Sequence, residues 1–98
     1  MQNWVLQLMH GTPLRVAIEF NRAMTMTDFR PDQQKISVPT LVIHGDKDLS
    51  APIDLTGRPT AAQIPNAELK IYQGAPHGLF LTHKDRLNAD LLAFITAT

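Results

Sequence analysis

The chain has 98 residues, 44% of them hydrophobic, which is enough for one small globular domain or a piece of a larger one. Basic and acidic residues number nine each, so no net charge favours binding to nucleic acid. The absence of cysteine excludes disulfides and thiolate metal sites and fits a cytoplasmic protein. The N-terminus lacks the features of a signal peptide, and no apolar run is long enough to span a membrane.

The first part of the chain is predicted to be helical. Residues 2–9 are apolar but too few to distinguish a helix from a strand. Thr12 and Pro13 then form a helix start, with threonine as the N-cap and proline at the first helical position. Apolar side chains recur at helical spacing after them, which predicts a helix over residues 13–24. Residues 25–34 are polar and are interpreted as a connector.

A buried strand is predicted over residues 41–43, an apolar run that stops at His-Gly-Asp. Residues 51–64 should then form the crossover helix of a βαβ unit. Pro59 interrupts them, and an interior proline costs a helix about 3 kcal/mol. We therefore expect one turn near Pro52 and a new helix with Pro59 in its first turn. The side chains expected to face the sheet are Thr60, Ala61 and Ile64.

A second strand and a last helix complete the predicted elements. Residues 68–73 alternate, which predicts a half-exposed edge strand with Leu69 and Ile71 inward. The outward side chains are expected to be Glu68, Lys70 and Tyr72. Thr82 and Asp85 have the spacing of a capping box at the start of a helix. The buried stripe of this helix is expected to contain Leu87, Leu91, Phe94 and Ile95.

One acid and one histidine follow the two predicted strands. Asp48 lies in the turn after the first strand, and His77 lies 29 positions later, in the loop after the second. Neighbouring parallel strands lie about 5 Å apart and end at the same edge of the sheet. There a carboxylate can hold an imidazole by its Nδ1–H and stabilise the imidazolium that forms when Nε2 takes a proton. The order acid, then histidine, each at a strand end, favours the last two members of a hydrolase triad.

Three alternatives compete with this interpretation. Asp46 could be the acid, but it directly follows a glycine and is better explained as an acceptor of backbone N–H groups in the turn. His44 at the strand end is interpreted as structural. A zinc site formed by these two residues with Asp48 and His77 is conceivable, although their spacing matches no metal motif. Each residue, taken alone, could also be an ordinary loop residue.

Nearly the whole chain resembles the C-terminal part of the α/β-hydrolase fold. More narrowly, it resembles the cofactor-free haloperoxidase branch, which includes arylesterases and perhydrolases. The segments that carry this resemblance are Thr-Asp-Phe-Arg-Pro-Asp at 27–32, Val-Pro-Thr-Leu-Val-Ile-His-Gly-Asp-Lys-Asp at 38–48, Ala-Glu-Leu-Lys-Ile-Tyr at 67–72, Gly-Ala-Pro-His-Gly at 74–78 and His-Lys-Asp-Arg-Leu-Asn-Ala-Asp-Leu-Leu at 83–92.

The resemblance implies a partial α/β-hydrolase fold: the last two parallel strands with their crossover and C-terminal helices, preceded by the end of a helical cap. Residues 1–34 would be the cap remnant and residues 35–98 the βαβα part of the core. Asp48 would be the catalytic acid and His77 the catalytic base of a serine-dependent esterase or perhydrolase. Its substrates would be a small ester, or a carboxylic acid with peroxide, and it would need no metal, haem or other cofactor.

The nucleophile of such a triad is missing from this sequence. Its serines are Ser37 and Ser50, and neither lies in the Gly-x-Ser-x-Gly elbow that presents a nucleophile. The oxyanion loop and the first strands of the fold are also missing. We therefore expect no activity from the isolated chain, and two hypotheses follow. Either it supplies the acid and base to a serine on another segment, or it is an inactive module that oligomerises or binds a partner through an open sheet edge.

Overall fold

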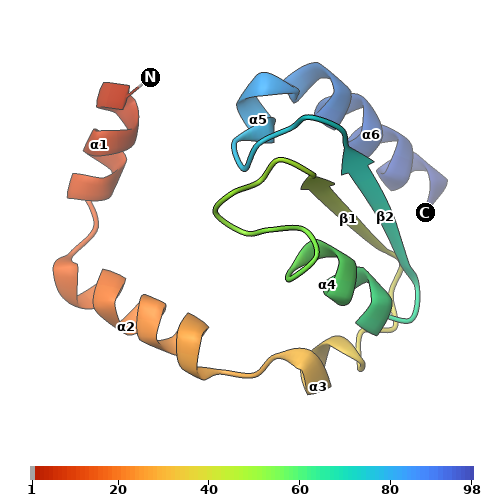
Figure 1. Cartoon of the computed structure of the whole chain (residues 1–98), viewed down its shortest axis with the longest axis horizontal. Coiled ribbons are helices and arrows are strands. Elements are labelled where there is room, and N and C mark those ends of the chain that lie inside the picture. Colours follow the sequence, from red (N-terminus) through yellow and green to blue (C-terminus); the bar gives the residue numbers. More distant parts are fainter. Residues whose placement is uncertain (1) are drawn as a thin grey trace.

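A parallel pair of strands forms the centre of the protein. The computed structural model describes residues 2–98, and within them the sheet consists of β1 (Thr40–Gly45) and β2 (Ala67–Tyr72) (Figure 1). The strands run in parallel and in register, with Thr40 opposite Ala67 and Gly45 opposite Tyr72. The helices are α1 (Gln2–His10), α2 (Leu14–Met26), α3 (Arg30–Gln33), α4 (Gly57–Gln63), α5 (Leu79–Thr82) and α6 (Lys84–Ala97).

Helices cover both faces of this sheet. Side chains alternate between the faces along a strand, so His44 of β1 and Tyr72 of β2 point in opposite directions. His44 packs against Gly57 at the start of α4, whereas Tyr72 is hydrogen-bonded to Asp90 of α6. The predicted βαβ unit with a C-terminal helix is therefore confirmed.

The crossover helix α4 begins where the sequence predicted. Residues 53–56 form turns, and the helix starts at Gly57 with Pro59 in its first turn, where the missing N–H group breaks no intrahelical hydrogen bond. Ile64 is buried at 5% exposure, and Thr60 and Ala61 are half-buried, as expected.

The predicted edge strand is wrong in one important respect. Tyr72 was expected to point into solvent, but its side chain is fully buried, with an exposed fraction of 0%. Its hydroxyl donates to Asp90, and the guanidinium of Arg86 stacks over its ring at 3.9 Å from the centroid. The reason is that α6 covers the face of β2 that carries Lys70 and Tyr72, and the Nζ of Lys70 lies 3.4 Å from Oδ1 of Asp90.

The capping box at Thr82 is also wrong. Thr82 is the last residue of the short helix α5, its hydroxyl lies 2.7 Å from Nδ1 of His83, and α6 starts at Lys84. On α6, Leu87 and Phe94 are half-buried, as expected for a packed stripe. The remaining two members of the predicted stripe, Leu91 and Ile95, are 40% and 66% exposed.

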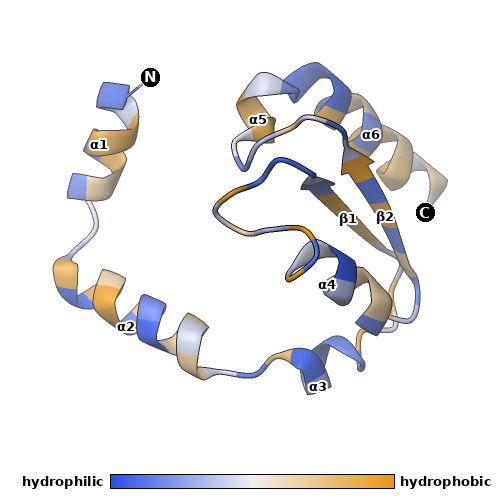
Figure 2. Ribbon diagram, viewed as in Figure 1, coloured by the Kyte–Doolittle hydropathy of each residue, from blue (hydrophilic) through white to orange (hydrophobic). Residues whose placement is uncertain are grey.

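The N-terminal helices stand apart from the sheet. α1 and α2 curve away from it in Figure 1, and every residue of both helices is exposed to solvent. α2 starts at Leu14 rather than Pro13, and Thr12 does not cap it: the Thr12 hydroxyl donates to the Leu8 carbonyl at 3.5 Å. Many residues of these two helices are hydrophobic, as the orange parts of α1 and α2 in Figure 2 show, and Phe20 is 67% exposed. The apolar stripe of α2 thus exists as predicted, without a covering element in residues 2–98.

Candidate active site

The loops after the two strands are tied to each other by their backbones. The N–H of Asp46 donates to the carbonyl of Tyr72 at 3.2 Å, and the N–H of Lys47 donates to the carbonyl of Ala75 at 3.0 Å. The carboxylate of Asp46 accepts the N–H of Gly74 at 2.6 Å. Asp46 therefore accepts a backbone N–H, as predicted, although the donor lies in the neighbouring loop rather than in its own turn.

Gly45 makes this close approach possible. It is buried at the end of β1, and a Cβ atom added there would lie 2.1 Å from the carbonyl oxygen of Ala75. Gly74 in the facing loop has a φ of +74°, a left-handed conformation that L-residues with a side chain rarely adopt. The two glycines thus set the separation and the path of the loops.

Asp48 is a buried carboxylate with both oxygens engaged. Its side chain is 5% exposed. Oδ1 accepts the backbone N–H groups of Ser50 at 3.0 Å and Ala51 at 2.8 Å, and Oδ2 lies 2.7 Å from Nδ1 of His77. Burial by itself would raise the pKa of Asp48, but the Ala51 N–H, the His77 imidazole and the Ser50 N–H outweigh it and hold the pKa below its ordinary value. Asp48 is thus an ionised hydrogen-bond acceptor at neutral pH.

His77 presents the opposite edge of its ring to solvent. Its side chain is 66% exposed, and within residues 2–98 its ring is hydrogen-bonded through Nδ1 to Asp48. Because an ionised carboxylate can only accept, Nδ1 of His77 carries the proton. The neutral ring then has its lone pair on Nε2, where it can accept a proton from an incoming hydroxyl. The contact between carboxylate and imidazole is therefore present as predicted.

His44 and Asp46 do not complete a metal site. Asp46 is bonded to Gly74, and Nε2 of His44 lies 2.7 Å from the carbonyl oxygen of Ala51. Within the described residues, 2–98, no group of three or more His, Cys, Asp or Glu side chains is arranged to hold a metal ion. The zinc alternative thus lacks the convergent ligands that it required.

Sequence reasoning missed a cluster of side chains behind the His77 loop, formed by Tyr72 with Asp90 and Arg86 of α6. Burial, followed by the hydrogen bond and the charge of Asp90, raises the pKa of Tyr72 to about 12. The carbonyl of Tyr72 accepts the N–H groups of both Asp46 and Ala75, so this residue joins the two loops to α6. The signal that could have found it was the strand alternation, since parallel strands usually have helices on both faces.

No helix within residues 2–98 has both the length and the apolar composition needed to cross a membrane.

Similar proteins were found by sequence and by structure. No protein-family model matches the chain. It is 51% identical over 75 residues to the non-heme chloroperoxidase CPO-A1 of Kitasatospora aureofaciens, covering 74% of this chain and 27% of that protein. It is 41% identical over 95 residues to the non-heme haloperoxidase of Rhodococcus erythropolis, covering 97% of this chain and 34% of that protein. It is also 41% identical over 73 residues to the bifunctional esterase/perhydrolase DCH of Acinetobacter calcoaceticus, covering 74% of this chain and 26% of that protein.

The crystal structure of bromoperoxidase from Bacillus anthracis superposes with a TM-score of 0.69 at 44% identity, covering 71% of this chain and 25% of that chain. The chain thus spans about a quarter to a third of the length of the curated relatives it matches (27%, 34% and 26%). Its two parallel strands, crossover helix and C-terminal helices form a partial α/β-hydrolase fold. The chain is therefore homologous to the C-terminal part of α/β-hydrolase-fold proteins of the non-heme haloperoxidase and perhydrolase branch.

Proposed function

We propose that this chain supplies the acid and the base of a serine-dependent ester hydrolase or perhydrolase. Asp48 is the acid, His77 is the base, and the serine nucleophile comes from another polypeptide segment. The observation that carries the proposal is the 2.7 Å contact between Oδ2 of the buried Asp48 and Nδ1 of the exposed His77. The names of the relatives, chloroperoxidase and esterase/perhydrolase, support the choice of reaction.

The proposed mechanism uses His77 as a proton carrier. Nε2 of His77 takes the proton of the serine hydroxyl as the serine oxygen bonds to the ester carbonyl carbon, and Asp48 stabilises the imidazolium that forms. The imidazolium then gives this proton to the departing alcohol, which leaves an acyl-serine. Water or hydrogen peroxide then attacks the acyl group and gives a proton to Nε2, which passes it to the serine oxygen as the carboxylic acid or the peracid leaves. When the acyl donor is a carboxylic acid, the group that leaves in the first step is water instead of an alcohol. The substrates are thus a small ester, or a carboxylic acid with peroxide.

We expect no esterase activity above background from the chain alone, because the nucleophile contributes most of the rate. Hydrolysis of p-nitrophenyl acetate by the wild type, His77→Ala and Asp48→Ala measures this. A wild-type rate that both substitutions abolish would contradict the expectation and would point to a nucleophile within these residues.

A chimera tests the roles themselves. The segment of the Rhodococcus erythropolis haloperoxidase that aligns over 95 residues is replaced by the matching part of this chain. We expect the chimera to hydrolyse p-nitrophenyl acetate, and Asp48→Asn to lower kcat by about 10⁴-fold because the imidazole tautomer is lost. His77→Ala should cost at least as much, whereas His10→Ala, on α1, is the matched control and should change little. An active chimera that is insensitive to His77→Ala would refute the proposal.

We also propose that residues 1–34 are the end of a helical cap and residues 35–98 the C-terminal part of the core. The separation of α1 and α2 from the sheet supports this division (Figure 1). A shortened chain of residues 35–98 should retain the circular dichroism spectrum of a βαβα unit, and loss of all cooperative unfolding would contradict the division.

A second candidate function follows from the open sheet edge. Within residues 2–98, β1 pairs with β2 on one side and has no strand on the other. A strand edge of this kind can pair with another chain. The alternative is therefore an inactive module that oligomerises or binds a partner. Size-exclusion chromatography at high concentration tests it, and a well-folded monomer would count against it.

A further inference from the structure

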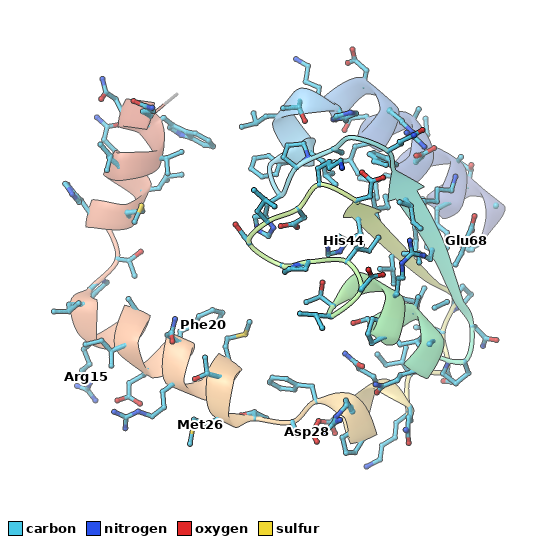
Figure 3. All side chains as sticks on the ribbon, viewed as in Figure 1. Arg15, Phe20, Met26, Asp28, His44 and Glu68 are labelled. Atoms are coloured by element: carbon cyan, nitrogen blue, oxygen red, sulfur yellow. The ribbon has the colours of Figure 1, made fainter. Side chains whose placement is uncertain are left out.

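His44 has contacts that go beyond filling space at the end of β1. We infer that His44 is a positioning residue for the carboxylate of Asp48, and this rests on the proposed function because Asp48 is the acid there. The side chain of His44 is 14% exposed and lies on the face of the sheet that α4 covers (Figure 3). Its Nε2 atom is 3.4 Å from Oδ2 of Asp48, the same oxygen that meets His77.

The ring nitrogen of His44 that carries hydrogen is identified by its partner. Nε2 lies 2.7 Å from the carbonyl oxygen of Ala51, and a carbonyl can only accept, so Nε2 carries a proton. The hydrogen bond therefore runs from His44 to Ala51. It joins the end of β1 to the far end of the turn that contains Asp48.

Ala51 transmits this constraint to Asp48. Its N–H donates to Oδ1 of Asp48 at 2.8 Å, while its carbonyl accepts from His44 and, at 3.2 Å, from the hydroxyl of Thr56. The peptide groups on either side of Ala51 are therefore held from both ends. If the His44 donor is lost, the carbonyl of Ala51 keeps the longer bond from Thr56, and the N–H group that Ala51 offers to Asp48 is held less firmly.

Gly57 fixes the orientation of the imidazole. A Cβ atom at position 57 would lie 2.7 Å from Nδ1 of His44 and 2.9 Å from its Cγ. Only a residue without a side chain leaves room for the ring there. The first residue of the crossover helix thus keeps Nε2 of His44 between Ala51 and Asp48.

The geometry explains why one carboxylate has two histidines beside it. His77 is exposed and contacts Oδ2 of Asp48 from the loop after β2. His44 is largely buried and approaches the same oxygen from β1, the strand that precedes Asp48. His44 supplies an N–H dipole near the charge, and His77 supplies the ring that would exchange protons. A displaced Asp48 would release the Nδ1–H of His77, so the effect of His44 should be measurable on His77.

The test is the tautomer of His77 in the full chain, read from ring ¹⁵N chemical shifts at about pH 8, where an ordinary histidine is neutral. We expect His77 to be an Nδ1–H tautomer in the wild type. His44→Leu removes the donor and should lower the Nδ1–H fraction at least about twofold, since only the carboxylate selects this tautomer. His44→Gln, whose amide N–H can reach Ala51, should restore it. His10→Leu on α1 is the matched control.

Gly57→Ala provides an independent variant that keeps the imidazole but displaces it. If His44→Leu does not fold, Gly57→Ala and His44→Gln still decide the question. Unchanged Nδ1–H signals in a folded His44→Leu or Gly57→Ala chain would overturn the inference. An equal loss in His44→Gln would do the same, because the donor would then not matter. A wild-type His77 that lacks the Nδ1–H would instead contradict the proposed function.

Discussion

The close approach of the two loops at Gly45 leads to a sharp prediction for Gly45→Ala. The added Cβ would lie 2.1 Å from the carbonyl oxygen of Ala75 and 2.6 Å from its carbonyl carbon, and ordinary contact begins at 3.4 Å. The loops must therefore separate by about 1.3 Å, the difference between 3.4 and 2.1 Å. Both atoms belong to the backbone, so no rotamer change can relieve the overlap. Overpacking of this kind costs about 1–3 kcal/mol.

The separation also breaks hydrogen bonds. The two bonds that join the loops, from Lys47 N–H to the Ala75 carbonyl and from Asp46 N–H to the Tyr72 carbonyl, contribute about 1 kcal/mol each. We expect Gly45→Ala to lower the free energy of unfolding by about 3–5 kcal/mol. Urea denaturation followed by circular dichroism measures this change.

Gly78→Ala is the matched control for this substitution. Gly78 has a φ of −80°, and a Cβ atom there would meet nothing within 4 Å. Its free energy of unfolding should stay within about 1 kcal/mol of the wild-type value. If Gly45→Ala were equally harmless, the argument that the glycine brings the two loops together would be refuted.

The protein contains one tyrosine, so absorbance at 295 nm titrates Tyr72 alone. In the folded protein the titration midpoint should lie near pH 12, because the pKa of Tyr72 is raised to about 12. Asp90→Asn should lower this midpoint. A midpoint near 10 in the folded chain would contradict the burial argument. Because the neutral phenol is favoured in the fold, stability should be lost as the pH rises from about 10 through about 12. The lowered pKa of Asp48 gives stability the opposite dependence on pH. Its contribution is full above the ordinary aspartate pKa and falls as the pH drops below about 4. Asp48→Asn should make this fall shallower in acid unfolding curves. Gly74→Ala, at a φ of +74°, should lower the free energy of unfolding by about 1–2 kcal/mol in urea, and no change would contradict the left-handed conformation.

The sequence predicted those parts of the structure that are determined by residues close to the ends of the strands and helices. The stop of the apolar run at the His-Gly-Asp sequence of residues 44–46, and the order of Asp48 and His77 after two neighbouring strands, were enough to predict their contact. Pro59 likewise indicated the start of α4, since proline is acceptable only in the first turn of a helix.

The failures occurred where a second packing partner decides the outcome. Tyr72 alternates with apolar residues as an exposed side chain would, yet the face that it occupies is covered by α6, and Asp90 lies 18 positions away in the sequence. Thr82 has the spacing of a capping box, but the chain forms the short helix α5 first and turns at His83. The contact of His44 with Asp48 depends on the path of the turn between them and on the start of α4, which no residue pattern reveals.

The backbone ties between the two strand-end loops also bear on how such a site can change during evolution. The carboxylate and the imidazole are oriented by bonds that begin and end within one continuous stretch of chain, residues 40–77. Recombination that moves this stretch as a block would carry the pair of Asp48 and His77 with its geometry intact. A join placed inside the stretch, for example within α4, would have to rebuild that geometry from two unrelated parents.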